Sequence, residues 1–209
     1  MTGGTGFIGA HLINALISDG KHVHALVRTP AKAEPLPKRG LTIFKGDILD
    51  PQSIKEAMEG CEEVYHLGGN ASIYEKDPTR YFTINVDGTK NVMDVAIELG
   101  IRRMVFTSTA GVLGPSVGGV VTEEKRREIG FFNEYESSKA EAEELVRKYV
   151  EDKEIDVIIV SPKQSEISVT GEIMARLAVI FVKEPIISLS SATLQFSVFC
   201  LPIELMQFK

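Results

Sequence analysis

The sequence opens with Met1-Thr2-Gly3-Gly4-Thr5-Gly6-Phe7-Ile8-Gly9, in which Gly3, Gly6 and Gly9 recur at every third position. Apolar side chains then follow at helical spacing until Gly20 stops the pattern: Phe7, Ile8, Leu12, Ala15 and Leu16. Glycines spaced in this way allow a tight turn, a close approach of backbone to phosphate, and close packing of the next helix. The free N–H groups at the start of that helix attract anions. The stretch therefore predicts a loop that binds the pyrophosphate of a dinucleotide.

The rest of the chain alternates short apolar runs with longer helical patterns. Strands are predicted at 23–27, 41–45, 63–67, 103–107 and 155–160, and helices at 7–19, 51–59, 79–99 and 134–152. Strands separated by helices of this length imply right-handed βαβ units and a parallel sheet. We therefore predict an α/β, Rossmann-type doubly wound fold. The pattern changes after Pro162, which divides the chain into a dinucleotide-binding domain over 1–162 and a partial substrate-binding appendage over 163–209.

Composition narrows the class of protein. The 209 residues are 44% hydrophobic and 25% charged, with a formal net charge of −6, which is typical of a soluble globular protein and unsuited to general nucleic-acid binding. The two cysteines, Cys61 and Cys200, are too few for a disulfide framework. No targeting segment is evident, and the apolar run 177–182 is too short to span a bilayer. These features predict a cytoplasmic protein without membrane contact, and the four histidines show no metal-ligand spacing.

Two residues after predicted strands bear on the choice of dinucleotide. Arg28 follows the second strand of the expected fold, where NAD enzymes carry an acidic residue that binds the ribose 2′-hydroxyl. Its guanidinium suits a 2′-phosphate, so we favour NADP, with NAD as the alternative. Asp47, followed by Ile48, ends the next strand, where a carboxylate can accept from the adenine amino group. The alternative interpretations are a solvated surface arginine and a simple turn before the next helix.

Tyr135 and Lys139 lie four residues apart and so share one face of a predicted helix. A nearby lysine cation lowers the pKa of a phenol, which can then exchange a proton with a carbonyl or carbinol oxygen. Tyr149 and Lys153 have the same spacing. Only Tyr135 begins its helix at the carboxyl edge of the sheet, where ligands bind, so Tyr135 is the preferred acid/base candidate.

Three hydroxyl side chains, Thr107, Ser108 and Thr109, end the strand before that helix. A hydroxyl at this edge can bond a substrate oxygen beside Tyr135. The alternative is that threonine suits a strand and serine suits a turn. The hydroxyls, the tyrosine and the glycine loop are together far more specific than any one of them.

These residues resemble the extended short-chain dehydrogenase/reductase family, which includes nucleotide-sugar epimerases, dihydroflavonol reductases and 3β-hydroxysteroid dehydrogenases. The resemblance covers residues 1 to about 162, in the family's order and spacing. The matching segments are Thr2 to Gly9, Gly46-Asp47, Val64 to Gly69, Asn85 to Asn91, Thr107 to Gly111 and Tyr135 to Lys139. Val27-Arg28-Thr29-Pro30 is more similar to the reductase branch than to the sugar epimerases.

The resemblance implies a role for each matching residue. Tyr135 would be the acid/base, Lys139 would hold the nicotinamide ribose and tune the tyrosine, and Thr109 would orient the substrate oxygen. Ser108 remains a rival for that last role. Asn85 would fix the floor of the active site. The implied cofactor contacts are Gly3, Thr5, Gly6, Phe7, Ile8, Gly9, Arg28, Asp47, Ile48, Leu67 and Gly68, together with Tyr135 and Lys139.

The sequence departs from the family pattern in three places. No strand precedes the glycine loop, so the central strand of the sheet is expected to be missing, with unpaired backbone on its two neighbours. Lys163 to Glu166 replaces a loop that contains glycine and proline in the family. Lys209 ends the chain short of most of the family's substrate lobe.

The leading functional hypothesis is an NAD(P)-dependent oxidoreductase, similar to dihydroflavonol reductase, that moves a hydride between nicotinamide and a small ketone or secondary alcohol. One alternative is an NAD-dependent nucleotide-sugar epimerase or dehydratase. Another is a non-catalytic NAD(P)-binding sensor, against which the presence of both Tyr135 and Lys139 argues. Family members often dimerise through the helix that bears Tyr135 and the preceding long helix, so a homodimer is a further implication of the resemblance. Substrate identity is left open.

Overall fold

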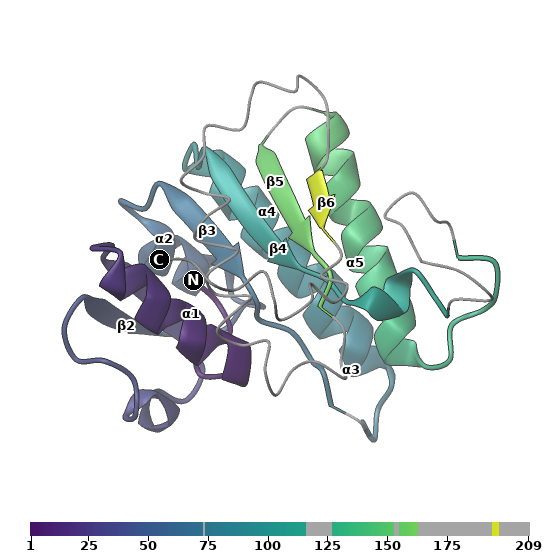
Figure 1. Ribbon diagram of the computed structural model, residues 1–209, viewed down its shortest axis with the longest axis horizontal. Coiled ribbons are helices and arrows are strands. Elements are labelled where there is room, and N and C mark those ends of the chain that lie inside the picture. Colours follow the sequence, from purple (N-terminus) through teal and green to yellow (C-terminus); the bar gives the residue numbers. More distant parts are fainter. Residues whose placement is uncertain (73, 116–126, 153–154, 163–193, 197–209) are drawn as a thin grey trace, which may run out of the picture.

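The computed structural model describes residues 1–72, 74–115, 127–152, 155–162 and 194–196. Its strands are all parallel to their neighbours (Figure 1). They are β1 (Val23–Val27), β2 (Leu41–Lys45), β3 (Glu63–His66), β4 (Arg103–Thr107), β5 (Asp156–Val160) and β6 (Leu194–Phe196). β1 pairs with β2, and β3, β4, β5 and β6 follow one another in order. The predicted α/β fold with a parallel sheet is confirmed.

The first two residues join these two groups of strands into one sheet. Thr2 forms parallel bridges to Leu26 of β1 and to His66 of β3. Its N–H donates to the Tyr65 carbonyl at 3.0 Å, and the Met1 carbonyl accepts from the N–H of Leu26 at 2.9 Å. The predicted gap at the centre of the sheet is therefore closed at the carboxyl ends of β1 and β3. Because the strand order reverses here, the glycine loop that follows Thr2 lies at the point where doubly wound folds bind their ligands.

The gap persists toward the amino ends of the same two strands. A cavity of about 410 Å³ lies there. Val23 and His24 of β1, Glu63 and Tyr65 of β3, and Met1 are among the residues that line it. It opens at the end of the sheet opposite the glycine loop, so it is separate from the predicted cofactor site.

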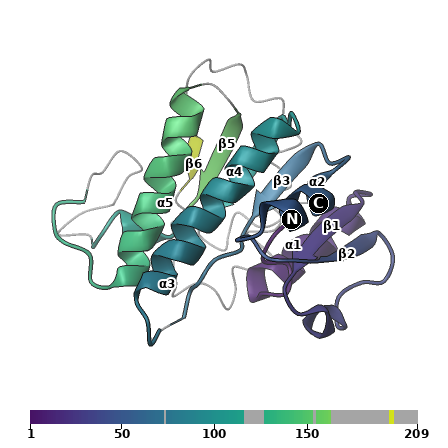
Figure 2. The same cartoon turned by 180° about the vertical axis from the view of Figure 1, so that it is seen from behind.

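Helices cover both faces of the sheet. They are α1 (Phe7–Ser18), α2 (Pro51–Met58), α3 (Thr79–Phe82), α4 (Gly88–Glu98) and α5 (Glu134–Glu151), with 3-10 turns η1 (Pro30–Ala33) and η3 (Ala110–Val112). α1 packs on one face against alternate residues of β1, such as Ala25 and Val27. α2, α4 and α5 bury the other face, with Phe106 of β4 and Ile159 of β5 at their contact. Figures 1 and 2 show the two layers from opposite sides. The predicted double winding is therefore present.

Most predicted helix boundaries agree with the structure because they rest on local capping chemistry. The Asp50 carboxylate accepts from the N–H of Gln52 at 3.1 Å, and Pro51 occupies the first helical position of α2. Asn133 caps α5 in the same way, accepting from the N–H of Glu136 at 2.9 Å. The start of each of these helices therefore follows directly from the sequence.

The predicted continuous helix over 79–99 is wrong in one respect. Between α3 and α4, residues Thr83–Asp87 form a π-helical turn, η2. The hydroxyl of Thr89 donates to the carbonyl of Asn85 at 2.6 Å. Asn85 lies in this turn and is buried, and the Thr89 bond to its carbonyl lies where η2 meets α4. Such turns are frequent at functional sites, and Asn85 is one of the predicted site residues.

Several predictions fall on residues that the structure does not describe. The appendage over 163–209 is one of these, except that β6 pairs with β5. Within the described ranges, no helix is long and apolar enough to cross a membrane.

Candidate functional site

The glycine loop is held by backbone contacts that leave no room for a side chain at Gly3 or at Gly9. Gly3 has a φ of +72°. A Cβ there would lie 2.6 Å from the carbonyl carbon of Leu67, directly after β3. A Cβ at Gly9 would lie 2.2 Å from the carbonyl oxygen of Gly3. The loop is thus folded back onto the start of α1 and lies against Leu67 and Gly68, two of the predicted cofactor residues.

The amino end of α1 is open to an anion. Gly6 is the N-cap residue and supplies no side-chain hydrogen bond to the first turn. Thr5, Gly6 and Phe7 are all exposed, whereas Ile8 is half-buried and packs against the core beneath α1. Exposed N–H groups at the positive end of a helix dipole are suited to a phosphate group. The loop therefore fits a pyrophosphate through its backbone, and Ile8 contributes packing through its side chain.

Three further predicted cofactor residues follow β1 and β2. Arg28 is exposed directly after β1. Asp47 is half-buried, and its carboxylate accepts from the N–H of Leu49 at 3.1 Å, which is the turn role that the sequence left open. Ile48 is half-buried, and its side chain occupies the space beside Gly88 at the start of α4. The turn thus positions Asp47, and Ile48 joins this turn to α4.

Tyr135 and Thr109 come together at the carboxyl edge of the sheet. Tyr135 is in the first turn of α5, and Thr109 lies in the loop after β4. Burial raises the pKa of Tyr135 above its ordinary value, the Thr109 side chain acts in the opposite direction, and the charge of Glu136 acts in the same direction as burial. The ring of Tyr81 packs edge-on against that of Tyr135, with centroids 6.4 Å apart. The phenol is therefore held in place and remains protonated at neutral pH.

The position of Lys139 differs from the prediction that its ammonium group lowers the pKa of Tyr135. Its Nζ donates to the carbonyl of Thr107 at 2.8 Å and lies 4.4 Å from the centre of the Phe106 ring. Burial lowers the pKa of Lys139 to about 8, with Glu143 acting to raise it. The predicted lowering of the Tyr135 pKa by this cation is not observed, because the ammonium group is directed at the strand end and the phenol is desolvated. Spacing alone placed both groups on one helix face without fixing where each side chain points.

The hydroxyl of Ser108 has a different hydrogen-bond partner from that of Thr109. The Ser108 hydroxyl donates to the Glu143 carboxylate at 2.5 Å, and both residues are buried. The other oxygen of that carboxylate pairs with Arg147 at 2.7 Å. Of the two hydroxyls that the sequence left as rivals, Thr109 is therefore the one at Tyr135. Sequence reasoning missed Glu143, although its position four residues after Lys139 on the same helix was a usable signal.

Comparison with known proteins agrees with this geometry. The family model described as "NAD dependent epimerase/dehydratase family" matches residues 1–166. The chain belongs to this family.

The relatives of this chain include a reductase and a sterol demethylase protein. The chain is 35% identical to sterol demethylase protein B of Methylococcus capsulatus over 78% of this chain and 49% of that protein. It is 33% identical to cinnamoyl-CoA reductase 1 of Petunia hybrida over 78% of this chain and 52% of that protein. The chain thus spans about half the length of the curated relatives it matches.

Solved structures of the family match the fold. UDP-glucose 4-epimerase of Thermus thermophilus in complex with NAD is 25% identical with a TM-score of 0.69, covering 77% of this chain and 53% of that one. A short-chain dehydrogenase/reductase superfamily protein of Agrobacterium tumefaciens with bound NAD is 29% identical with a TM-score of 0.67, over 77% and 47% of the two chains. The resemblance seen in the sequence and the predicted Rossmann-type fold are both confirmed.

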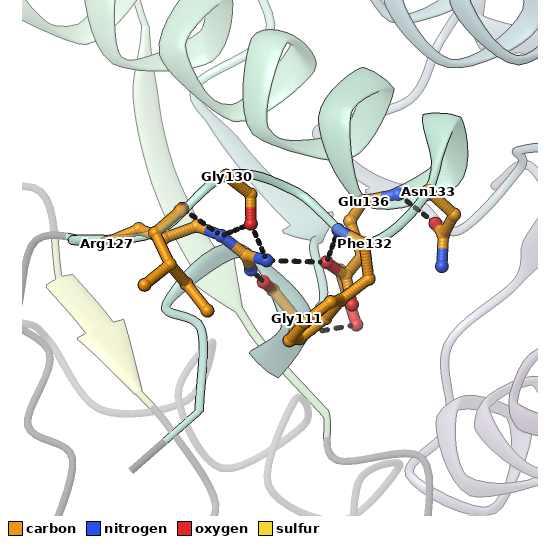
Figure 3. A network of polar contacts seen from close by, with 8 residues as sticks. Gly111, Arg127, Gly130, Phe132, Asn133 and Glu136 are labelled. Atoms are coloured by element: carbon orange, nitrogen blue, oxygen red, sulfur yellow. Dashed lines mark hydrogen bonds and ion pairs between the residues drawn. The ribbon is translucent and has the colours of Figure 1, made fainter. Parts of the chain in front are cut away.

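In this epimerase/dehydratase-family chain, an arginine that the sequence did not single out ties the loop after β4 to the first turn of α5. The guanidinium of Arg127 donates to the carbonyl of Gly111, just after Thr109, and to that of Gly130 (Figure 3). It also pairs with the Glu136 carboxylate at 2.9 Å, next to Tyr135. The Arg127 side chain is 7% exposed, so the pair is shielded from solvent. These bonds of Arg127 hold η3 against the first turn of α5.

Asn85 is buried and bonds two segments near Tyr135. Its side-chain oxygen accepts from the N–H of Asn70 at 2.7 Å, and its amide nitrogen donates to Ser138 at 2.9 Å. The Ser138 hydroxyl in turn donates to the carbonyl of Tyr135 at 2.9 Å. Asn85 therefore joins the loop after β3 to the first turn of α5.

Proposed function

We propose that this chain carries the cofactor-binding and proton-transfer half of an NADP-dependent oxidoreductase that interconverts a ketone and a secondary alcohol. The observation that carries the proposal is that Thr109, in the loop after β4, and Tyr135, in the first turn of α5, both lie at the carboxyl edge of the sheet. The glycine loop lies at the strand-order switch of the same edge. Ketone reduction needs a protonated acid beside a bound dinucleotide, and the raised pKa of Tyr135 is consistent with that role.

The residues present fit a nicotinamide dinucleotide. The exposed amino end of α1 would hold the pyrophosphate, and Arg28 would pair with a 2′-phosphate. Leu67 and Gly68, which lie against Gly3, would face the nicotinamide side, with Lys139 on the ribose. When bound, the dinucleotide supplies or accepts a hydride at nicotinamide C4.

In the proposed reduction, Tyr135 donates its hydroxyl proton to the carbonyl oxygen while the carbonyl carbon receives the hydride. Thr109 hydrogen-bonds the same oxygen and holds it within reach of the phenol. The product is a secondary alcohol, and Tyr135 is left as a phenolate that regains its proton from solvent. Burial of Tyr135 disfavours the phenolate, so the hydroxyl is protonated and available as a proton donor when the ketone binds.

The direct test is hydride transfer by the purified chain. NADPH and NADH are each mixed with a panel of ketones, and loss of the reduced nicotinamide absorbance is followed. We expect consumption of NADPH that depends on both the ketone and the protein. Binding of NADPH is measured separately by titration, so that a chain able to bind but unable to turn over is recognised. Binding without turnover on any ketone would favour a sensor.

An epimerase or dehydratase is the second candidate, because the solved epimerase of Thermus thermophilus shares the fold with a TM-score of 0.69. An enzyme that regenerates its own cofactor has no need to release it. Cofactor is therefore extracted from freshly purified protein and identified by mass. Retained NAD that does not exchange with added cofactor would support this candidate over ours.

Reversing the charge at Arg28 tests the cofactor preference. Arg28→Asp is expected to weaken NADPH binding by about 10- to 100-fold, since hydrogen bonds to a charged group contribute about 1.5–3 kcal/mol. NADH binding is expected to hold or improve, because the carboxylate can accept from a ribose hydroxyl. Arg102→Asp is the matched control, since Arg102 pairs with Glu62 at the surface at the far end of β4. An unchanged ratio of NADPH to NADH affinity in Arg28→Asp would contradict the assignment.

The pH dependence of reduction tests Lys139. With a pKa of about 8, its ammonium group is charged below that pH and loses its charge above it. If the charged form holds the ribose, kcat/KM for reduction should be level below pH 8 and fall about tenfold per pH unit above it. Lys139→Met should lower the rate and remove the inflection. A level profile up to pH 10 in the unaltered protein would contradict the role.

A further inference from the structure

A series of hydrogen-bonded, buried polar groups connects the predicted cofactor loop to helix α5, which carries Tyr135. Its members come from different segments and none is more than 4% exposed. They are Thr2, His66, Thr89, Asn85 and Ser138. Buried hydroxyl, imidazole and amide groups are stable only when each donor meets an acceptor, so the direction of every hydrogen bond is constrained.

The direction is fixed first at Thr89. Its hydroxyl has one proton, which goes to the carbonyl of Asn85 at 2.6 Å, because a carbonyl only accepts. The Thr89 oxygen also lies 3.0 Å from Nε2 of His66. With its proton already committed, that oxygen must accept there. His66 therefore has its hydrogen on Nε2.

The opposite side of the ring follows from this assignment. A neutral imidazole protonated on Nε2 presents Nδ1 as an acceptor. The Thr2 hydroxyl lies 2.7 Å from Nδ1, and so it donates to the ring. The same Thr2 oxygen accepts from the N–H of Gly68 at 2.9 Å. One side of His66 thus orients the start of the glycine loop and the loop after β3 together.

The surroundings of His66 keep it neutral. The ring is buried, and burial together with the charges of Lys139 and the amino terminus lowers its pKa to about 3. The Phe106 ring packs beside it, with centroids 5.9 Å apart. The ring therefore stays neutral around neutral pH, and the Thr89 hydroxyl keeps it in one tautomer.

We propose that His66 is a positioning residue that sets the geometry of the nicotinamide-binding loop and of Tyr135 at once. Toward the loop it acts through Thr2 on Gly68. Toward the helix it acts through Thr89 on Asn85. Asn85 donates to the Ser138 hydroxyl, which donates to the carbonyl of Tyr135. The proposal rests on the function proposed above, since the hydrogen bonds end at the groups assigned there to cofactor binding and proton transfer.

The test removes the hydroxyl of Thr89, which lies in the middle of this series of hydrogen bonds. Thr89→Val keeps the side-chain shape and deprives Nε2 of its acceptor, and Thr89→Ser should restore it. Thr42→Val is the matched control, because Thr42 also meets a histidine nitrogen, that of His22 at 2.8 Å, but on the exposed surface. All variants are compared at a temperature at which each is fully folded by circular dichroism.

Two readouts are independent of catalysis. Nitrogen NMR of the unaltered protein should show His66 protonated on Nε2 alone from pH 5 to 8. Hydrogen exchange at the Gly68 amide should be at least tenfold faster in Thr89→Val and unchanged in Thr42→Val and Thr89→Ser. In the same series, the Kd for NADPH should rise about tenfold in Thr89→Val alone.

The outcomes separate the two proposals. A hydrogen on Nδ1 in the unaltered protein, or unchanged Gly68 exchange in Thr89→Val, would overturn the role of His66 even if NADPH binds normally. Failure of the unaltered protein to bind NADPH or NADH would overturn the proposed function. In that case the tautomer and the Gly68 exchange rate would still decide whether His66 couples the two segments.

Discussion

Replacement of Tyr135 by phenylalanine is expected to lower kcat/KM for ketone reduction by about 10²- to 10⁴-fold, the usual contribution of a positioned general acid. The ring and its packing against Tyr81 are kept, so the fold and the affinity for NADPH should change little. Steady-state rates on the best ketone of the panel and an NADPH titration measure the two quantities. A rate that survives the substitution would show that another group donates the proton.

The chain supplies its own control for this experiment. Tyr149 lies in the same helix and has the same spacing to a following lysine, but its hydroxyl bonds Asp94 on the neighbouring helix α4. Tyr149→Phe removes the same atom from the same kind of side chain at a place remote from the sheet edge. It should leave kcat/KM within about twofold, so a large loss in Tyr135→Phe alone would assign the effect to position.

The parts of the fold that were predictable from sequence are those with local causes. The start of α2 follows from Asp50 and Pro51, and the buried strand β5 follows from its apolar run. The glycine spacing gave the loop before α1. By contrast, the π-helical turn contains Asn85, whose hydrogen bonds include those to a hydroxyl four residues later and to a residue in the loop after β3. Periodicity carries no information about such bonds.

The same distinction applies to the site. Residue type and spacing predicted Tyr135, Lys139 and the three hydroxyl side chains before them as site residues, because their order along the chain places them at one edge of a parallel sheet, and the family resemblance implied Thr109 among the hydroxyls. The sign of the Tyr135 pKa shift was not predictable, since the phenol is buried and the Lys139 side chain bonds the Thr107 carbonyl. Arg127 was missed because it lies in an irregular segment, where no pattern marks a residue that bonds several carbonyl groups.

Adding a methyl group at Gly9 is expected to destabilise the fold strongly. The new Cβ would lie 2.2 Å from the carbonyl oxygen of Gly3, so the glycine loop or α1 must move. We expect Gly9→Ala to cost about 3 kcal/mol or more in free energy of unfolding, at the upper end of overpacked sites, and to lower Tm by about 6 °C or more. Gly60→Ala is the control, since no atom lies within 4 Å of a Cβ there and only its φ of +76° opposes alanine.

Gly6 separates the stability of the loop from its binding role. A Cβ at Gly6 meets only the Gly3 carbonyl oxygen, at 3.3 Å, and the backbone φ of −80° suits alanine. Gly6→Ala should therefore cost about 1 kcal/mol or less in unfolding free energy, a typical loss for alanine at an N-cap. Its methyl group would nevertheless stand at the exposed amino end of α1, where a pyrophosphate must approach the backbone. We expect the Kd for NADPH to rise at least tenfold while Tm falls by only a few degrees. Unaltered NADPH affinity in Gly6→Ala would mean that the dinucleotide, if bound, does not lie across this loop.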